Sequence, residues 1–139
     1  MAEQHDQGKE VIFPRGQKIT SDHFIGQVWL ARLVSGDDVF NCSIGNVTFE
    51  PGARNSWHKH PGGQILLVTG GLGCYQERGK PVQLLRPGDV VRIMPNIEHW
   101  HGASPDSWLS HLAISTCLDK GEVEWLEPVT DEAYRDAAS

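Results

Sequence analysis

Hydrophobic and polar residues alternate over short runs along most of the chain, and glycine or proline interrupts each run. Alternation with a period of two, in segments rich in β-branched and aromatic residues, is typical of half-buried strands. The expected strands are Val28–Val34, Val39–Phe49, Ser56–His60, Gln64–Thr69, Gly73–Glu77, Val82–Leu85, Val90–Met94 and Trp108–Thr116. No long helical period separates them, so the pattern predicts an all-β fold, a sandwich or a small barrel.

The two ends of the chain differ from this centre. Residues 1–10 are polar, and we expect a disordered tail there, followed by a single domain over residues 11–139. Residues 123–126 are expected to form one more strand or an extended arm. Thr130 is expected to cap a short helix that begins at Asp131, because a hydroxyl there can accept a hydrogen bond from the first turn.

Composition narrows the choice of function. Twelve basic and eighteen acidic side chains give a net charge of −6, which argues against nucleic acid and against an anionic membrane as partners. No signal peptide or membrane-spanning run is visible, so a cytoplasmic location is expected. Cys42, Cys74 and Cys117 are widely spaced among apolar neighbours and are expected to be buried thiols, with a disulfide or a thiolate metal site as the alternative.

Histidine is concentrated in the centre of the chain, at positions 58, 60, 99, 101 and 111. Alternate residues of a strand share a face, so His58 and His60 point the same way. A turn then leads to Gln64, whose amide oxygen can reach the same point, and His99 could complete the set. Three imidazole nitrogens and one oxygen suit Mn, Fe, Co, Ni or Zn with open coordination positions. His101 has the same strand parity as His99, and could compete for the metal or line the pocket.

These residues fit two sequence motifs. The pattern Gly52-x5-His58-x-His60-x3-Gln64-x6-Gly71 resembles the first motif of the cupins, which usually carries Glu where this chain has Gln64. The pattern Gly88-x5-Met94-x-Asn96-x2-His99 resembles the second motif, with Met94 and Asn96 as departures. The resemblance implies a jelly-roll β-barrel with the metal inside. Small cupins of this kind usually pair through N-terminal strands, which implies a homodimer or a higher homo-oligomer.

A narrower resemblance covers residues 49–54, 57–64, 99–103 and 111–114. These segments are similar to a cupin subgroup that includes bacterial manganese-dependent hydroxynitrile lyases and cupins associated with carboxymuconolactone decarboxylases. The resemblance implies a ligand set of His58, His60, Gln64 and His99. It also implies manganese as the first expectation for the metal, and His111 as a further active-site residue.

The resemblance favours a metal-dependent lyase acting on a small oxygenated substrate. With Gln64 in place of Glu, the ligands are all neutral, and the metal keeps its full +2 charge and its strength as a Lewis acid. A cupin dioxygenase or isomerase and a non-catalytic ligand-binding cupin are the alternatives. His111 is expected either to transfer a proton or to be a hydrogen-bonded core residue. Trp100 and Trp108 are candidates for an apolar wall of the pocket.

Overall fold

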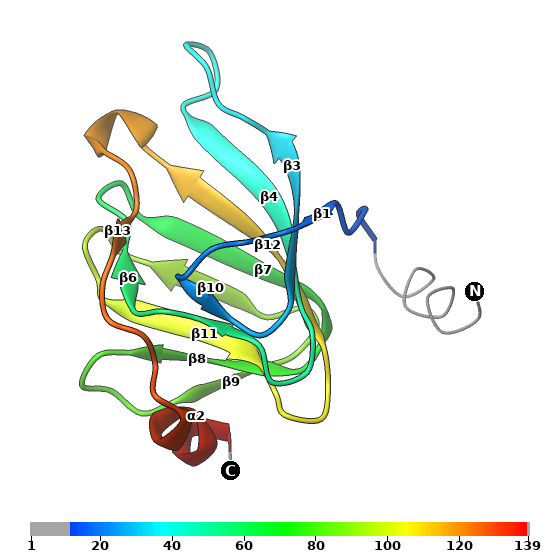
Figure 1. Cartoon of the computed structure of the whole chain (residues 1–139). Helices are drawn as coiled ribbons and strands as arrows, with labels where there is room; N and C mark the ends of the chain where they lie inside the picture. Colours follow the sequence, from blue (N-terminus) through cyan, green and yellow to red (C-terminus); the bar gives the residue numbers. More distant parts are fainter. Residues whose placement is uncertain (1–11, 139) are drawn as a thin grey trace.

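The computed structural model describes residues 12–138 and consists of two antiparallel sheets that face each other (Figure 1). The first sheet has the strand order β1-β3-β4-β12-β7-β10. Its strands are β1 (Gln17–Lys18), β3 (Val28–Val34), β4 (Cys42–Phe49), β7 (Gln64–Gly71), β10 (Val90–Ile93) and β12 (Leu109–Thr116). The three central strands are long because their β-branched and leucine side chains are covered on the inner face.

The second sheet is built mostly from shorter strands. The order β13-β6-β11-β5-β2 runs across it, and β8 and β9 extend it from the other edge of β11. Its strands are β2 (Phe24–Ile25), β5 (Arg54–Asn55), β6 (His58–Lys59), β8 (Gly73–Glu77), β9 (Gln83–Leu85), β11 (His99–Ala103) and β13 (Glu124–Trp125). The two sheets together form the walls of a jelly-roll barrel, as predicted.

Two apolar cores hold the second sheet between them. The inner core lies between the sheets and includes Phe49, Leu66 and Leu109, all fully buried. The outer core lies between the sheet and helix α2 (Asp131–Ala138), and is centred on Trp100 and Tyr134. All five residues of β11 are therefore buried, because its inward side chains meet the barrel interior and its outward ones meet the outer core.

In the C-terminal segment, the strand β13 and the helix α2 lie close to the predicted positions. β13 falls within the expected residues 123–126. The Oγ1 atom of Thr130 accepts a hydrogen bond from the backbone N–H of Ala133 at 3.1 Å, which confirms the predicted cap. Arg54, buried to 3% exposure, donates to the carbonyl of Val129 and pairs with Asp131, which fixes the helix to the sheet.

Several strand boundaries predicted from the sequence are wrong. The strand expected from Val39 begins at Cys42, because the side chain of Asp37 accepts hydrogen bonds from the N–H groups of residues 39 and 40 and holds a turn there. The strand expected over residues 56–60 is only two residues long. The strands β1, β2, β5 and β11 and the 3₁₀ turn at Leu118–Lys120 were not predicted. β1, β2 and β5 are only two residues long, too short to show an alternating pattern, and Gly102 and Ala103 lower the β propensity of β11.

The prediction for the cysteines holds for one of three. Cys74 is buried, and burial raises the pKa of its thiol to about 12, whereas Cys42 is half-buried and Cys117 is exposed. Cys117 directly follows β12 and has a left-handed backbone conformation, with a φ of +50°. All three thiols are free. The predicted tail lies in residues 1–10, outside the described residues, and no helix of residues 12–138 is long and apolar enough to cross a membrane.

Candidate metal centre

Three histidines from adjacent strands meet inside the barrel. His58 on β6 lies directly opposite His99 on β11, and their ring centroids are 4.2 Å apart. His60 follows β6, with its ring centroid 5.2 Å from that of His58. One ligand atom from each of the three rings lies within 4.8 Å of the others, a spacing that could hold a metal ion.

The turn after His60 leads directly into β7, which begins at Gln64. Gly63 has a φ of +87°, and its N–H donates to the carbonyl of His60 at 3.0 Å. Gly62 lies against the end of β12, where a Cβ at this position would lie 2.1 Å from the Thr116 carbonyl oxygen. Only glycine fits that approach, so the Gly62-Gly63 pair is what allows β7 to begin beside the histidines.

Backbone carbonyls set the tautomers of two rings. The Nδ1 atoms of His58 and His99 lie 2.8 Å and 2.9 Å from the carbonyl oxygens of Ser56 and Ile97. A carbonyl only accepts, so both Nδ1 atoms carry the proton, and each Nε2 atom is left as an unprotonated donor of an electron pair. Metal-binding histidines in proteins have this arrangement, in which a carbonyl orients the ring from behind.

Three side-chain atoms of the predicted ligands are buried and have no hydrogen-bond partner within the described part of the chain. They are Nε2 of His60, Nε2 of His99 and Oε1 of Gln64. The amide of Gln64 is oriented by its other end, since Nε2 donates to Oγ of Ser115 at 3.4 Å. A buried polar atom without a partner is costly, and a cation bound at this point would satisfy all three at once. The residues therefore fit a divalent metal with nitrogen and oxygen ligands.

Burial keeps these rings uncharged. Desolvation, strengthened by repulsion from His99, lowers the pKa of His60 to about 4. Desolvation also lowers the pKa of His99 to about 4, although the Ile97 carbonyl opposes this shift. The pKa of His58 is lowered well below its usual value, again mainly by burial. Neutral imidazole is the form that binds a metal, so the site is ready to bind one at neutral pH.

A second pair of histidines lies beside this group. Nε2 of His111 is 3.2 Å from Nδ1 of His101, and both rings are buried. His101 lies between the two sets, with its ring centroid 5.6 Å from His58 and 4.8 Å from His111. Asn55 holds His101, because its Oδ1 accepts the His101 backbone N–H at 2.9 Å. His111 thus contacts His101, which in turn lies beside the ring of His58.

Some neighbours of the centre were not found from the sequence. Asn55 and Ser115 orient site residues, and the sequence carries no signal for either role. Trp125 of β13 packs on His58, with ring centroids 4.8 Å apart, and this contact depends on a pairing of β13 with β6 that the sequence left open. Trp100 was predicted as a candidate pocket wall, which is wrong: it points out of the barrel into the outer core.

Comparison with known proteins agrees with this geometry. The family model of the cupin domain matches residues 45–113. The (R)-mandelonitrile lyase of Granulicella tundricola is 48% identical over 115 residues, which are 83% of this chain and 88% of that protein. The crystal structure of a cupin-like protein from Thermotoga maritima superposes with a TM-score of 0.90 at 56% identity, over 93% of this chain and 98% of that one. A cupin barrel protein from Rhodopseudomonas palustris shares the fold at a TM-score of 0.68 and 16% identity, over 86% and 80% of the two chains.

The lowered pKa values predict how the metal-free protein responds to acid. His60, His99 and His111 have a pKa of about 4 when folded, against about 6.5 when unfolded. The unfolded chain therefore binds more protons between these values, and stability falls as the pH drops from about 6.5 toward 4. We expect the free energy of unfolding in urea, measured with a chelator present, to be constant above pH 7 and to fall steadily from pH 6.5 to 5.

Replacing His60 and His99 together by Gln should make that fall shallower, because two of the titrating groups are removed. The range above pH 5 separates the histidines from the carboxylates, most of which titrate lower. A stability that does not change between pH 7 and 5 in the metal-free protein would contradict the burial of neutral rings.

Proposed function

Since this chain belongs to the cupin domain family, we propose that it is a divalent-metal-dependent lyase that cleaves and forms cyanohydrins. The proposal goes beyond family membership, because one fold hosts many activities and the site must carry the argument. The curated relative that is 48% identical is named for mandelonitrile, an aromatic cyanohydrin, and we take that class as the substrate here.

The observation that supports this most directly is that three of the predicted ligands, His60, Gln64 and His99, each keep a buried atom without a hydrogen-bond partner. With His58 they make a set of four neutral ligands, for which we propose manganese first among the divalent transition metals. A metal bound here would supply Lewis-acid stabilisation of a substrate hydroxyl oxygen as it loses its proton. Gln64 contributes no negative charge, so it does not weaken that effect as a glutamate would.

The His101–His111 pair supplies the proton transfer in this proposal. Cleavage of a cyanohydrin breaks the bond between the hydroxyl-bearing carbon and the nitrile carbon, and its electron pair leaves with cyanide. The hydroxyl proton passes to the neutral imidazole of His111 or its partner, and finally to the cyanide, so a carbonyl compound and hydrogen cyanide are formed. Burial lowers the pKa of both rings, which keeps them neutral and able to accept a proton at neutral pH.

The proposed function is tested by turnover without oxygen. The protein would be stripped with a chelator and reloaded separately with Mn, Fe and Zn, with mandelonitrile as the probe. We expect equal amounts of cyanide and benzaldehyde, with no oxygen consumed, and no activity from His60→Ala, in which one metal ligand is missing. Consumption of oxygen with the substrate would favour a dioxygenase instead. Binding of mandelonitrile without turnover under every metal would favour a ligand-binding cupin.

Replacing His111 tests the proton role. We expect His111→Ala to keep its metal and its fold, and to lower turnover by roughly 10²- to 10⁴-fold, the usual contribution of a positioned acid or base. The fall in rate on the acid side of the pH profile should disappear with the ring. His111→Gln is the matched control, because an amide can keep a hydrogen bond to His101 but cannot transfer a proton. If the glutamine variant has normal turnover, His111 is a structural residue.

Replacing Gln64 by Glu tests the charge of the ligand set. The carboxylate should tighten binding of Mn or Zn, measured by competition with a chelator, and Ser115 can still hold it by donating its hydroxyl hydrogen. Turnover of mandelonitrile should nevertheless fall, because the added negative charge reduces the pull on the substrate oxygen. Turnover equal to or above that of the unchanged protein would refute the charge argument. Ser115→Ala is the control: it removes the hydrogen bond that orients Gln64 and leaves the charge of the ligand set unchanged.

A further inference from the structure

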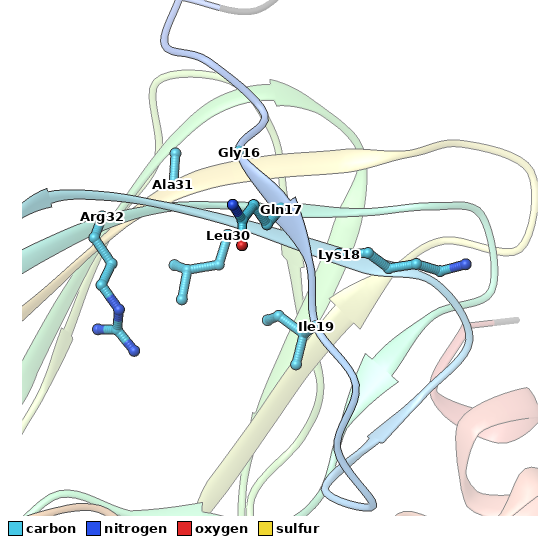
Figure 2. A pocket seen from close by; sticks show the side chains of 7 residues that line it. All are labelled: Gly16, Gln17, Lys18, Ile19, Leu30, Ala31 and Arg32. Atoms are coloured by element: carbon cyan, nitrogen blue, oxygen red, sulfur yellow. The ribbon is translucent and has the colours of Figure 1, made fainter.

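A hollow of about 410 Å³ lies against β1 and β3, at the edge of the first sheet, and is lined by residues 16–19 and 30–32. Figure 2 shows Ile19, Leu30 and Arg32 pointing to one side of these strands and Ala31 pointing to the other. Ile19 packs on the inner core, so the side to which these three residues point is the side that faces the barrel interior. The hollow therefore belongs to the inner side of the sheet.

The strand register connects Arg32 to the metal centre along this inner face. Arg32 lies directly opposite Gly45 of β4, and Gly45 lies opposite Ala113 of β12. Directly opposite residues have their side chains on the same face of a sheet. Ser115 is two residues further along that face of β12, and its hydroxyl accepts the hydrogen bond from the amide of Gln64. The side chains of β4 and β12 on this path are no larger than serine, so they do not block the way from Arg32 to Gln64.

The inner face also becomes more exposed toward this end of the barrel. On β12, Leu109 and His111 are fully buried, whereas Ala113 and Ser115 are half-buried. Among the three histidines grouped at the metal centre, His60 is the half-buried one. A ligand that comes from solution therefore reaches the metal centre past this end of β12, which is the end closest to Arg32 in the strand register.

Arg32 is the charged side chain that faces this approach. It is exposed, and within residues 12–138 it forms no ion pair. The pairing of β3 with β4 shifts register between Arg32 and Val34, and irregularities of this kind re-aim side chains and are frequent beside active sites. Lys18 lies opposite Trp29, so it has the other strand parity, and Figure 2 shows its side chain directed away from Arg32.

We propose that Arg32 binds a carboxylate group of the substrate, at the end remote from the reacting hydroxyl. The inference rests on the proposed function for the reacting end, and it specifies the substrate as a cyanohydrin that carries a carboxylate beyond an apolar spacer. A guanidinium binds a carboxylate through two parallel hydrogen bonds. Ile19 and Leu30 give the spacer an apolar surface in the hollow.

The dimensions and the charge of the barrel agree with such a substrate. The backbones of β3 and β7 are three strand spacings apart, about 14 Å along the sheet, which an arginine side chain and a spacer the size of a benzene ring span together. No aspartate or glutamate among the described residues is buried, so the interior of the barrel holds no charge that would repel an anion. The positive charge of Arg32 is then the group that selects a carboxylate over an uncharged substituent.

Binding of a compound that cannot react tests the carboxylate site separately from the lyase reaction. The probe is para-(hydroxymethyl)benzoate, which has a hydroxyl and a carboxylate but no nitrile, and its methyl ester is the uncharged comparison. With manganese-loaded protein, we expect calorimetry to give a Kd about 10-fold or more lower for the acid than for the ester, because the ester cannot form the charged pair. Arg32→Gln should remove this difference, and Arg32→Lys should keep part of it.

Lys18→Gln is the matched control, because it removes one positive charge from the rim of the same hollow and should leave the preference for the acid unchanged. Equal affinity for the acid and the ester would overturn the proposal. So would a preference that survives Arg32→Gln, since the carboxylate would then bind at the metal. A loss in Lys18→Gln as large as in Arg32→Gln would also overturn it, because the effect would then be one of general charge.

Turnover distinguishes a failure of this inference from a failure of the proposed function. We expect kcat/KM to be about 10-fold higher for para-carboxymandelonitrile than for mandelonitrile, and Arg32→Gln to abolish that advantage. If neither nitrile is cleaved but the binding results hold, the lyase proposal fails and the carboxylate site stands. If mandelonitrile is cleaved and the carboxylate gives no advantage, the lyase proposal stands and the role of Arg32 is refuted.

Discussion

Five imidazole rings, contributed by the central histidines, are packed inside one small barrel, and the need to keep them uncharged governs the rest of the site. A charged ring would lose its hydration without a buried carboxylate to replace it. Each ring therefore carries one proton, and the backbone decides where it sits: Ser56 and Ile97 fix the protons of His58 and His99 on the far side of the rings. Unprotonated nitrogens then face inward, and a metal is the partner that satisfies them.

The strand that supplies two of these rings is itself held from both sides. His99 and His101 face the barrel interior, whereas Trp100 between them is sealed under helix α2. The helix is tied down by Tyr134, whose hydroxyl donates to the carbonyl of Ala103 at the end of the same strand, and by the buried guanidinium of Arg54. These contacts of the outer core hold β11 in place, and with it the position of His99 opposite His58 of β6. The C-terminal segment, remote in sequence, is part of what builds the metal centre.

The alternation of side chains along the strands made much of the fold and part of the metal centre predictable from the sequence. The long strands β3, β7 and β12 and the shared face of His58 and His60 follow from a period of two, and the motif spacing added Gln64 and His99. What failed depends on tertiary contacts. Arg54-Asn55 becomes a strand only because β11 and β2 lie on either side of it. Trp100 points outward because the helix covers that face. The pairing of His101 with His111 needs the approach of two strands from different sheets, which no local pattern encodes.

The lack of buried negative charge inside the barrel links the geometry of the metal centre to the proposed reaction. Among the described residues no aspartate or glutamate is buried, and the interior polar groups around the centre are neutral histidines and amides. A bound divalent cation would therefore keep its charge in a region of low dielectric, where its attraction for an anion is much stronger than in water. The proposed metal ligands are uncharged, so a bound substrate would have to balance the charge of the cation. A substrate that becomes an alkoxide, with a cyanide ion as the second product, supplies negative charge where the ligand set supplies none. In this proposal the neutral pair His101 and His111 takes up and returns the proton.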